Sequence, residues 1–234
     1  HPDGRVSLIT GALINGRHFT GRDMPSDLVP GKLYEIELPL HFTTWTFQPG
    51  HKIRLAVGNA QFPIAWPSPF KMTTKLALGT KATALILPAI PLTTTGAPEF
   101  NKVVEDKPES NDGEYLELSR GKPEFKKYTT KDLTTGETSI FYETNSAYQI
   151  KRRQFFVAGS NKWTIHDKNP CCASYEGKMS TRIKSSGRAV RLTTQIKVES
   201  NKTHFMVTVV RTLTRNGRSI RKKTWTEEIP RVNS

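Results

Sequence analysis

The sequence predicts an all-β protein, a jelly-roll or related β-sandwich with antiparallel sheets. Several segments alternate apolar and polar side chains with a period of two, which is typical of half-buried strands. Pro-Gly and Asn-Gly turn signals recur between these segments. No stretch shows the apolar periodicity of a long amphipathic helix. Strands joined by short turns, without helices between them, indicate a sandwich rather than an α/β fold.

The N-terminal part is predicted to hold four strands, at residues 6–10, 33–40, 51–57 and 83–87. In the second of these, "LYEIELPL", the side chains of Tyr34, Ile36 and Leu38 share one face. Residues 88–98, "PAIPLTTTGAP", are rich in Pro and Thr and indicate a connector.

Strands are also predicted in the second half, at residues 139–142, 153–157 and 188–198, with one helical turn at 169–178. The strongest local pattern is a hairpin around Asn216-Gly217, a pair that is favoured in type I′ turns. The core side of this hairpin is expected to carry Phe205, Val207, Val209 and Ile220. Its solvent side is expected to carry Arg211, Arg215, Lys222 and Lys223.

We expect two parts in the chain. Residues 1–97 are predicted to form the later part of a β-sandwich, and residues 98–234 a β-rich C-terminal extension that packs on the same sandwich. No run of about 18 apolar residues occurs, so neither a membrane-spanning helix nor a membrane partner is expected.

The two cysteines are adjacent, at Cys171 and Cys172. This arrangement excludes a disulfide framework and argues against a zinc site made of cysteines. It is compatible with a reducing compartment, so a cytoplasmic location is favoured, although the sequence does not establish it.

The formal net charge of +14 is unevenly distributed. Residues 1–100 hold nine Lys and Arg against six Asp and Glu, while residues 101–234 hold 26 against 15. A basic half can bind nucleic acid or an anionic surface, but a solvated sheet face or an acidic partner domain explains it equally well. Because no nucleic-acid fold motif is present, nucleic acid is not expected as a partner.

Catalytic motifs are missing from the sequence. There is no Gly-x-Ser-x-Gly, no His-Glu-x-x-His, no P-loop and no dinucleotide fingerprint. His51 lies on the apolar face of a predicted strand without an acidic neighbour, which favours a core histidine. His166 and Asp167 could pair, but neighbouring strand residues point to opposite faces. We therefore expect no catalytic residue, cofactor or metal in this chain, and whether the chain is part of an enzyme stays open.

Five aromatic residues gather within a short stretch of the chain: Trp45, Phe47, Phe62, Trp66 and Phe70. Three interpretations stay open. They can cover an ordinary core, dock another domain, or form a stacking platform for carbohydrate.

Three spaced motifs resemble a known family. "PDGRVSLITGALINGR", "LVPGKLYEIELPL" and "FQPGHKIRLAVGNAQFP" occur in the order found in the C-terminal domain of X-Pro dipeptidyl-peptidase-like serine hydrolases. This group includes cocaine-esterase-like enzymes and α-amino-acid ester hydrolases. The resemblance covers Pro2 to about Pro63 and continues more loosely through "TALILPAIP". Later, "DKNPCCASYEGK" and "KKTWTEEIPR" resemble the ends of longer members, with departures at several positions.

The resemblance implies a galactose-binding-like jelly roll whose first strands precede His1. It also implies that the catalytic Ser, Asp and His lie in an upstream α/β-hydrolase domain. The chain would then be a non-catalytic β-domain of an acyl esterase or Xaa-Pro dipeptidyl-peptidase, which scaffolds the catalytic domain, shapes its substrate pocket and makes homo-oligomer contacts. A stand-alone carbohydrate-binding β-sandwich is the alternative.

Five residues are expected to have structural or docking roles in this arrangement: His51, Arg54, Trp45, Phe62 and Trp66. His51 is expected to fix the start of a strand after the Pro49-Gly50 turn. Arg54, on the outer face, is expected to pair with a neighbouring strand or with the catalytic domain.

Overall fold

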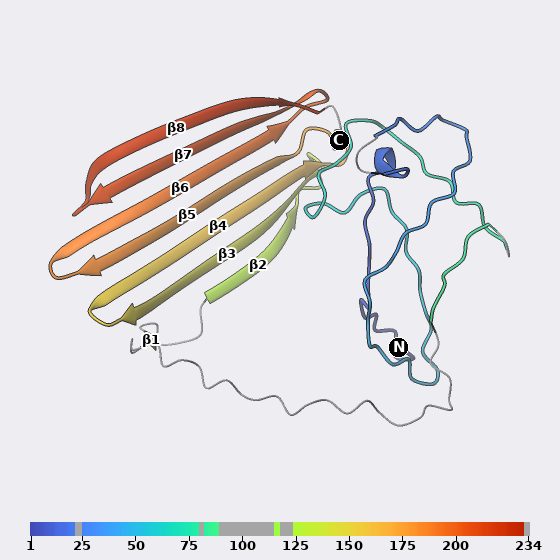
Figure 1. Ribbon diagram of the computed structural model, residues 1–234, viewed down its shortest axis with the longest axis horizontal. Coiled ribbons are helices and arrows are strands. Elements are labelled where there is room, and N and C mark those ends of the chain that lie inside the picture. Colours follow the sequence, from blue (N-terminus) through green and yellow to red (C-terminus); the bar gives the residue numbers. More distant parts are fainter. Residues whose placement is uncertain (22–24, 80–81, 89–114, 118–123, 232–234) are drawn as a thin grey trace. The chain divides into compact units, whose positions relative to one another are not determined.

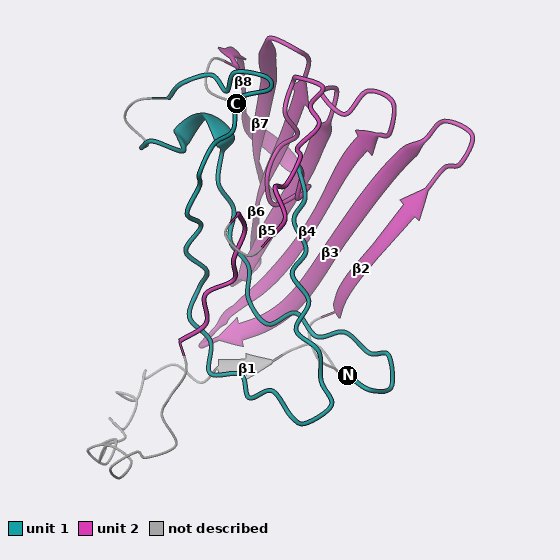
Figure 2. Cartoon of the chain, turned by 90° about the vertical axis from the view of Figure 1, so that its right-hand side faces the viewer, with its two compact units in different colours: residues 1–59, 232–234 teal, residues 60–231 magenta. Residues whose placement is uncertain are grey.

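The computed structural model describes residues 1–21, 25–79, 82–88, 115–117 and 124–231. Contacts divide the chain into two units, residues 1–59 with 232–234 and residues 60–231 (Figure 2). The described secondary structure consists of a single 3-10 turn, η1 (Gly16–His18), and eight strands. The all-β prediction is therefore confirmed.

The eight strands form one antiparallel sheet in unit 2 (Figure 1). Their bounds are β1 (Tyr115–Glu117), β2 (Glu124–Lys131), β3 (Glu137–Ile150), β4 (Arg153–His166), β5 (Ser174–Ser185), β6 (Arg188–Ser200), β7 (His204–Arg215) and β8 (Arg218–Pro230). From β3 to β8 each strand pairs with the next one along the chain, which makes a meander. β1 and β2 both pair with the outer side of β3. Because the described strands make one layer, the second layer of the expected sandwich stays a prediction.

The connections of the meander fall at two ends of the sheet. Turns at residues 151–152, 186–187 and 216–217 lie at one end, which we call the hairpin end. The longer connections, residues 167–173 and 201–203, lie at the other end, which we call the anchor end. At the hairpin end, Asn216 and Gly217 have φ angles of 47° and 83°, as a type I′ turn requires. The predicted Asn-Gly hairpin is confirmed.

The two faces of the sheet differ in polarity because paired residues point to the same side. One row across the strands contains Ile140, Trp163, Tyr175, Val198 and Val207, and its side is called the apolar face. The adjacent row contains Phe141, Lys162, Glu176, Lys197 and Thr208, and its side is called the polar face.

The buried residues of unit 2 gather at the anchor end. Within the described ranges they are Pro67, Pro69, Ser139, Thr164, Cys171, Ala173, Gly177, Ser200 and Arg231. The large side chains of the apolar face are half-buried or exposed. The most tightly packed part of the sheet is therefore small, lies at one end and contains several polar side chains.

Some expected elements differ from the structure. The four N-terminal segments predicted as strands have no strand pairing, and apolar side chains in all of them are exposed. A period-two pattern shows which side chains would share a face, but it does not provide a neighbouring strand. No other strand pairs with these four segments within the described part of the chain. The segment predicted as a helical turn instead makes a short turn and enters β5 at Ser174. Most of the predicted connector at 88–98 lies outside the described residues.

Ile220 was expected on the core side of the hairpin, but it is 56% exposed. The pairing of β7 with β8 shifts at this point, because Leu213 faces Arg221 and Thr214 faces Ser219. Ile220 is thus the extra residue of a bulge and has no cross-strand partner. Sequence alternation does not reveal such an insertion.

Gly177 provides a test of packing on the apolar face. A Cβ at this position would collide with the ring of Tyr175 and the side chain of Ile196. We expect Gly177→Ala to lower the free energy of unfolding by about 1–3 kcal/mol in urea titrations. The matched control is Gly159→Ala, whose Cβ would meet the movable side-chain ends of Met179 and Thr144. Equal losses in both variants would contradict this packing.

Candidate functional site

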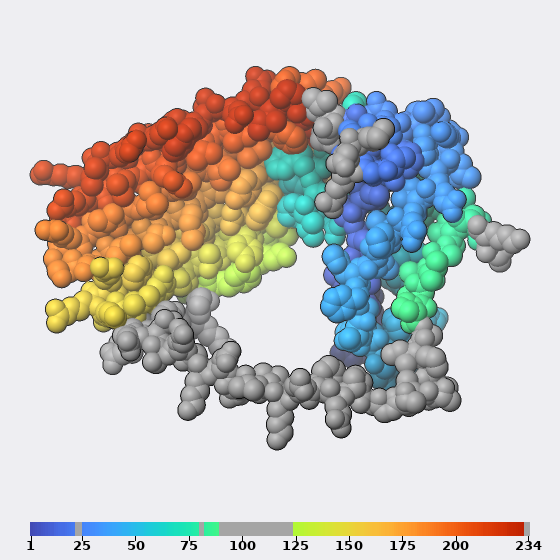
Figure 3. Space-filling model, viewed as in Figure 1, coloured from blue at the N-terminus to red at the C-terminus, as the bar shows by residue number. Residues whose placement is uncertain are grey.

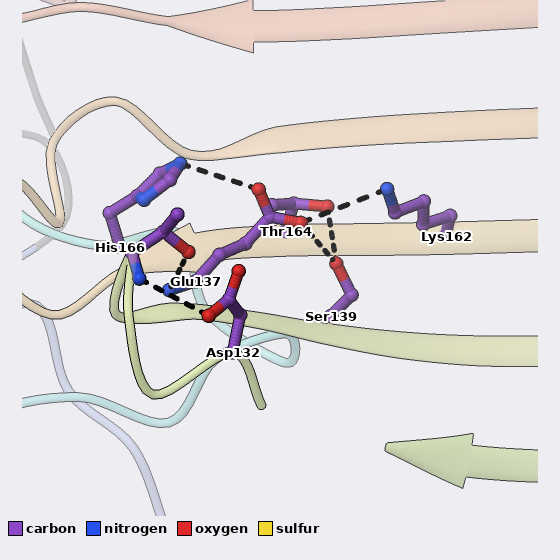
Figure 4. Close-up of polar contacts among 7 residues, drawn as sticks. Asp132, Glu137, Ser139, Lys162, Thr164 and His166 are labelled. Carbon is purple, nitrogen blue, oxygen red and sulfur yellow. Dashed lines mark hydrogen bonds and ion pairs between the residues drawn. The ribbon is translucent and has the colours of Figure 1, made fainter. Parts of the chain in front are cut away.

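A polar cluster at the anchor end is the first candidate site (Figure 4). The register of β3 and β4 places Glu137 opposite His166 and Ser139 opposite Thr164, on the polar face. Ser139 Oγ donates to Glu137 Oε1 at 3.0 Å and lies 3.0 Å from Thr164 Oγ1. His166 Nε2 lies 3.7 Å from Glu137 Oε2, and Lys162 Nζ lies 3.9 Å from Glu137 Oε1.

This cluster contains the residue types of a hydrolytic triad but not the order of contacts. In a triad the histidine contacts the serine and the acid orients the histidine. Here the carboxylate of Glu137 lies between Ser139 and His166 and contacts both. Ser139 is also only 2% exposed, so a substrate cannot reach its hydroxyl. The arrangement satisfies buried polar groups and does not prepare a nucleophile.

His166 and Asp167 do not pair, as expected for neighbouring residues of a strand. His166 faces Glu137 across the sheet, while Asp167 forms an ion pair with Lys131 at 2.9 Å. Neighbouring residues at the end of a strand diverge, so each finds a partner on another element.

The adjacent cysteines are the second candidate. Cys171 is buried and Cys172 exposed; both are free, with their Sγ atoms 3.9 Å apart. Desolvation is the largest cause of a raised pKa for the Cys172 thiol, and hydrogen bonding to Cys171 adds to it. A thiol with a raised pKa is mostly protonated at neutral pH and is a poor nucleophile.

A hollow of about 680 Å³ on the polar face is the third candidate. It extends from β2 to β7, and its charged lining residues are Glu124, Lys126, Glu143, Lys178 and Arg191. Ser, Thr, Asn and Gln supply most of the remaining lining, and no aromatic side chain lines it. Within the described residues, no group of three His, Cys, Asp or Glu side chains is placed to hold a metal ion.

Trp66 fastens the segment of residues 60–70 to the sheet. Its Nε1 donates to Ser200 Oγ at 2.8 Å, and its ring meets Phe205 edge-on with centroids 5.7 Å apart. Phe62 packs edge-on against Trp66 from the same segment, at 6.0 Å. Ser200 Oγ in turn donates to the carbonyl oxygen of Cys171 at 2.6 Å, so its hydroxyl serves as both donor and acceptor.

Arg231 completes this contact directly after β8. Its guanidinium donates to the carbonyl oxygens of Pro67, Cys171 and Asn201, the last at 2.9 Å. The same group lies 4.7 Å from the centroid of the Phe205 ring. Arg231 is 7% exposed, and desolvation lowers the pKa of its guanidinium. We call the set of Trp66, Pro67, Cys171, Ser200, Phe205 and Arg231 the Arg231 clamp.

The other expected residues lie in unit 1. The backbone N–H of His51 donates to Gln48 at 3.1 Å, and Gly50 has a φ of 83°, so His51 closes the expected turn. Its ring packs edge-on against His1 at 4.5 Å. Trp45 is 44% exposed and Arg54 is also exposed. The docking roles of these residues stay predictions.

Sequence analysis did not identify Ser200, Phe205 or Arg231 as members of a site. The local signal was the "IPR" ending of the last strand, since Pro interrupts strand pairing and leaves the next side chain free to turn inward. The sequence of a basic chain does not show which of its arginines is buried, so only the fold distinguishes Arg231 from the exposed arginines.

Comparisons with known proteins give one match. Residues 1–99 match the family model of the X-Pro dipeptidyl-peptidase C-terminal non-catalytic domain. Neither the curated proteins nor the solved structures contain a significant match to the chain. The matched range contains the three motifs on which the resemblance rests and ends before β1.

Replacement of Arg231 tests the clamp. We expect Arg231→Met to lower the free energy of unfolding by about 2–5 kcal/mol, because three buried carbonyl groups lose a charged donor. Arg231→Lys should lie between methionine and wild type, since one ammonium cannot reproduce the planar fork. Urea titration measures all three proteins. The control, Arg218→Met on the exposed surface, should change the value by less than about 0.5 kcal/mol. Equal effects at both positions would contradict the clamp.

Proposed function

We propose that this chain is the non-catalytic β-region of a serine hydrolase, because residues 1–99 match the family model of the X-Pro dipeptidyl-peptidase C-terminal non-catalytic domain. In this proposal it scaffolds an α/β-hydrolase domain linked to it and shapes the substrate pocket of that domain. The parent enzyme would cleave acyl esters or Xaa-Pro peptides. The family match is the observation that carries the proposal.

The chemistry of the polar groups supports a non-catalytic role. Ser139 is buried and donates to a carboxylate rather than to a histidine. Cys172 is the exposed thiol, and its pKa is raised rather than lowered. Neither group meets the requirements of an activated nucleophile.

The exposed apolar side chains of unit 1 support docking to another domain. Phe42 is 95% exposed, and Val6, Leu8, Leu33, Trp45 and Ile53 are also exposed. Many exposed large apolar side chains in one unit favour an interaction site over a surface that stays in water. A hydrolase domain that covers this surface would remove it from water.

The Arg231 clamp supports the scaffold role. The segment of residues 60–70 directly follows unit 1, and Trp66 and Arg231 hold it on the sheet through Ser200 and Phe205. We propose that residues 1–97 form a galactose-binding-like jelly roll, and that the sheet of residues 124–230 extends it. The apolar face of the sheet is suited to such packing.

A stand-alone carbohydrate-binding module is the alternative. The polar hollow offers hydroxyl and amide groups for sugars, but its lining lacks the aromatic ring on which sugars stack. Of the two tryptophans considered for stacking, Trp66 lies in the Arg231 clamp and Trp45 is 44% exposed in unit 1.

Labelling with a fluorophosphonate probe tests the assignment. We expect no label on this 234-residue chain and a single label on the polypeptide made from the whole reading frame, measured by intact mass. Label on this chain would overturn the non-catalytic assignment. If neither polypeptide is labelled, the carbohydrate module gains support, and calorimetry with soluble glycans, using Trp45→Ala as the negative variant, becomes the deciding measurement.

Docking through unit 1 gives a separate expectation for the polypeptide of the whole reading frame. We expect Trp45→Ala to weaken the contact with the hydrolase domain by about 1–3 kcal/mol, since a large ring leaves the interface. Hydrogen exchange should show loss of protection at residues 40–50 in this variant. Lys202→Ala, on an exposed turn of the sheet, is the control. Unchanged protection in Trp45→Ala would contradict the docking role.

A further inference from the structure

The hairpin end of the sheet is strongly basic, and Glu117 of β1, which pairs with Tyr148, is the one acidic residue that the described strand pairing places there. Its three stretches, residues 148–155, 182–191 and 211–223, surround the three tight turns and contain no Asp or Glu. They contain thirteen cationic side chains: Lys151, Arg152, Arg153, Arg182, Lys184, Arg188, Arg191, Arg211, Arg215, Arg218, Arg221, Lys222 and Lys223. The three turns form the left margin of the sheet in Figures 1 and 3.

The anchor end differs, because it carries acidic and basic residues together. Acidic residues gather there: Asp132, Glu137, Asp167, Glu176, Glu199, Glu227 and Glu228. Several of them are neutralised by ion pairs, such as Lys131 with Asp167 and Lys197 with Glu199, the latter at 2.8 Å. In the described part of the chain, none of the thirteen cations of the hairpin end forms an ion pair with a carboxylate. Among the described side chains, these thirteen cations are therefore not neutralised by ion pairs.

The strand register places like charges directly opposite each other at the hairpin end. Three such pairs occur: Arg182 with Arg191, Arg211 with Lys223, and Arg215 with Arg218. Like charges at facing positions destabilise a sheet. Facing cations oppose folding of the sheet, and an anionic partner that binds them would offset their repulsion.

Aliphatic side chains are interspersed among these cations. Ile220 projects from the bulge beside Arg221, and Ile150 and Val190 are each 38% exposed next to the other two turns. Phosphates of a nucleic acid gain nothing from aliphatic groups, whereas lipid headgroups allow such side chains to reach the acyl boundary.

The positions of the cations also distinguish between anionic partners. Arg182, Lys184 and Arg191 lie on the polar face, while Arg211 and Lys223 lie on the apolar face. The charge therefore surrounds the end of the sheet and does not line one groove. Aromatic rings nearby are already in contact with other groups: Arg182 and Lys184 lie over Phe156, and Lys223 lies over Trp225. Single-stranded nucleic acid stacks its bases on aromatic side chains along a cationic groove. Such binding would need aromatic rings that are not already covered by cations of the protein.

We propose that the hairpin end is a peripheral binding surface for an anionic lipid bilayer. The three turns would meet the headgroups together, with the cations near the phosphates and the aliphatic side chains between them. The expectation of no membrane partner rested on the lack of a spanning run, and the described helices likewise include none long and apolar enough to cross a bilayer. A surface contact requires no spanning helix.

Vesicle co-sedimentation of the 234-residue chain tests this proposal. We expect binding to phosphatidylcholine vesicles in which one third of the lipid is phosphatidylglycerol, no binding to pure phosphatidylcholine, and weakening as salt rises. The double variant Arg152→Glu/Arg218→Glu reverses one charge at each outer turn. It should bind the anionic vesicles at least about tenfold more weakly. Both side chains are exposed and lie outside the Arg231 clamp.

The matched control is Lys168→Glu/Lys202→Glu, which makes the same change of net charge at exposed turns of the anchor end. It should retain vesicle binding. Equal losses in the two double variants would overturn the proposal, because net charge alone would then explain binding. No sedimentation with anionic vesicles at low salt would also overturn it. Binding to a labelled oligonucleotide without binding to vesicles would replace the lipid surface with nucleic acid.

Discussion

The contact between Arg231 and three backbone carbonyl groups is the constraint on which the anchor end depends. The acceptors belong to Pro67, Cys171 and Asn201, which come from three separate connections. Irregular backbone at these positions cannot satisfy itself through a ladder, and a buried carbonyl without a donor is costly. One planar guanidinium with several donors meets all three, and the Phe205 ring lies against it. The first residue after the meander thereby holds connections that precede and join its strands.

The rest of the sheet shows why such a contact is needed. The meander is held by regular backbone pairing, but its large side chains are half-buried or exposed on both faces. A single layer buries little apolar surface, so its hydrophobic stabilisation is small. The buried set is concentrated where Trp66 and Arg231 close over Ser200 and Phe205. An apolar face with this degree of exposure favours a further covering layer, in agreement with the proposal that the sheet extends a jelly roll formed by residues 1–97.

Sequence reasoning succeeded where local patterns determine the structure. Alternation located the strand at residues 188–198, and Asn216-Gly217 located a turn that needs two positive φ angles. β5 was not predicted, because a helical turn was expected at residues 169–178. Sequence reasoning failed where the outcome depends on a partner. The segment at residues 33–40 alternates as clearly as a strand but has no ladder. Register decides that Glu137 meets His166, and a bulge leaves Ile220 exposed. The role of Arg231 follows from tertiary structure, since the three carbonyl groups that its guanidinium contacts lie far from it in the sequence.

The two ends of the sheet differ in whether their charged side chains form ion pairs, and this difference links stability to function. At the anchor end, Asp167, Glu137 and Glu199 each have a cationic partner, and the buried polar groups are satisfied. At the hairpin end, facing cations repel each other, and none of them forms an ion pair among the described side chains. A fold can retain such repulsion only when stability is supplied elsewhere, because domains are marginally stable. The clamp supplies it at a distance from the charged turns. The hairpin end is therefore free to keep a charge pattern that serves a partner rather than the fold.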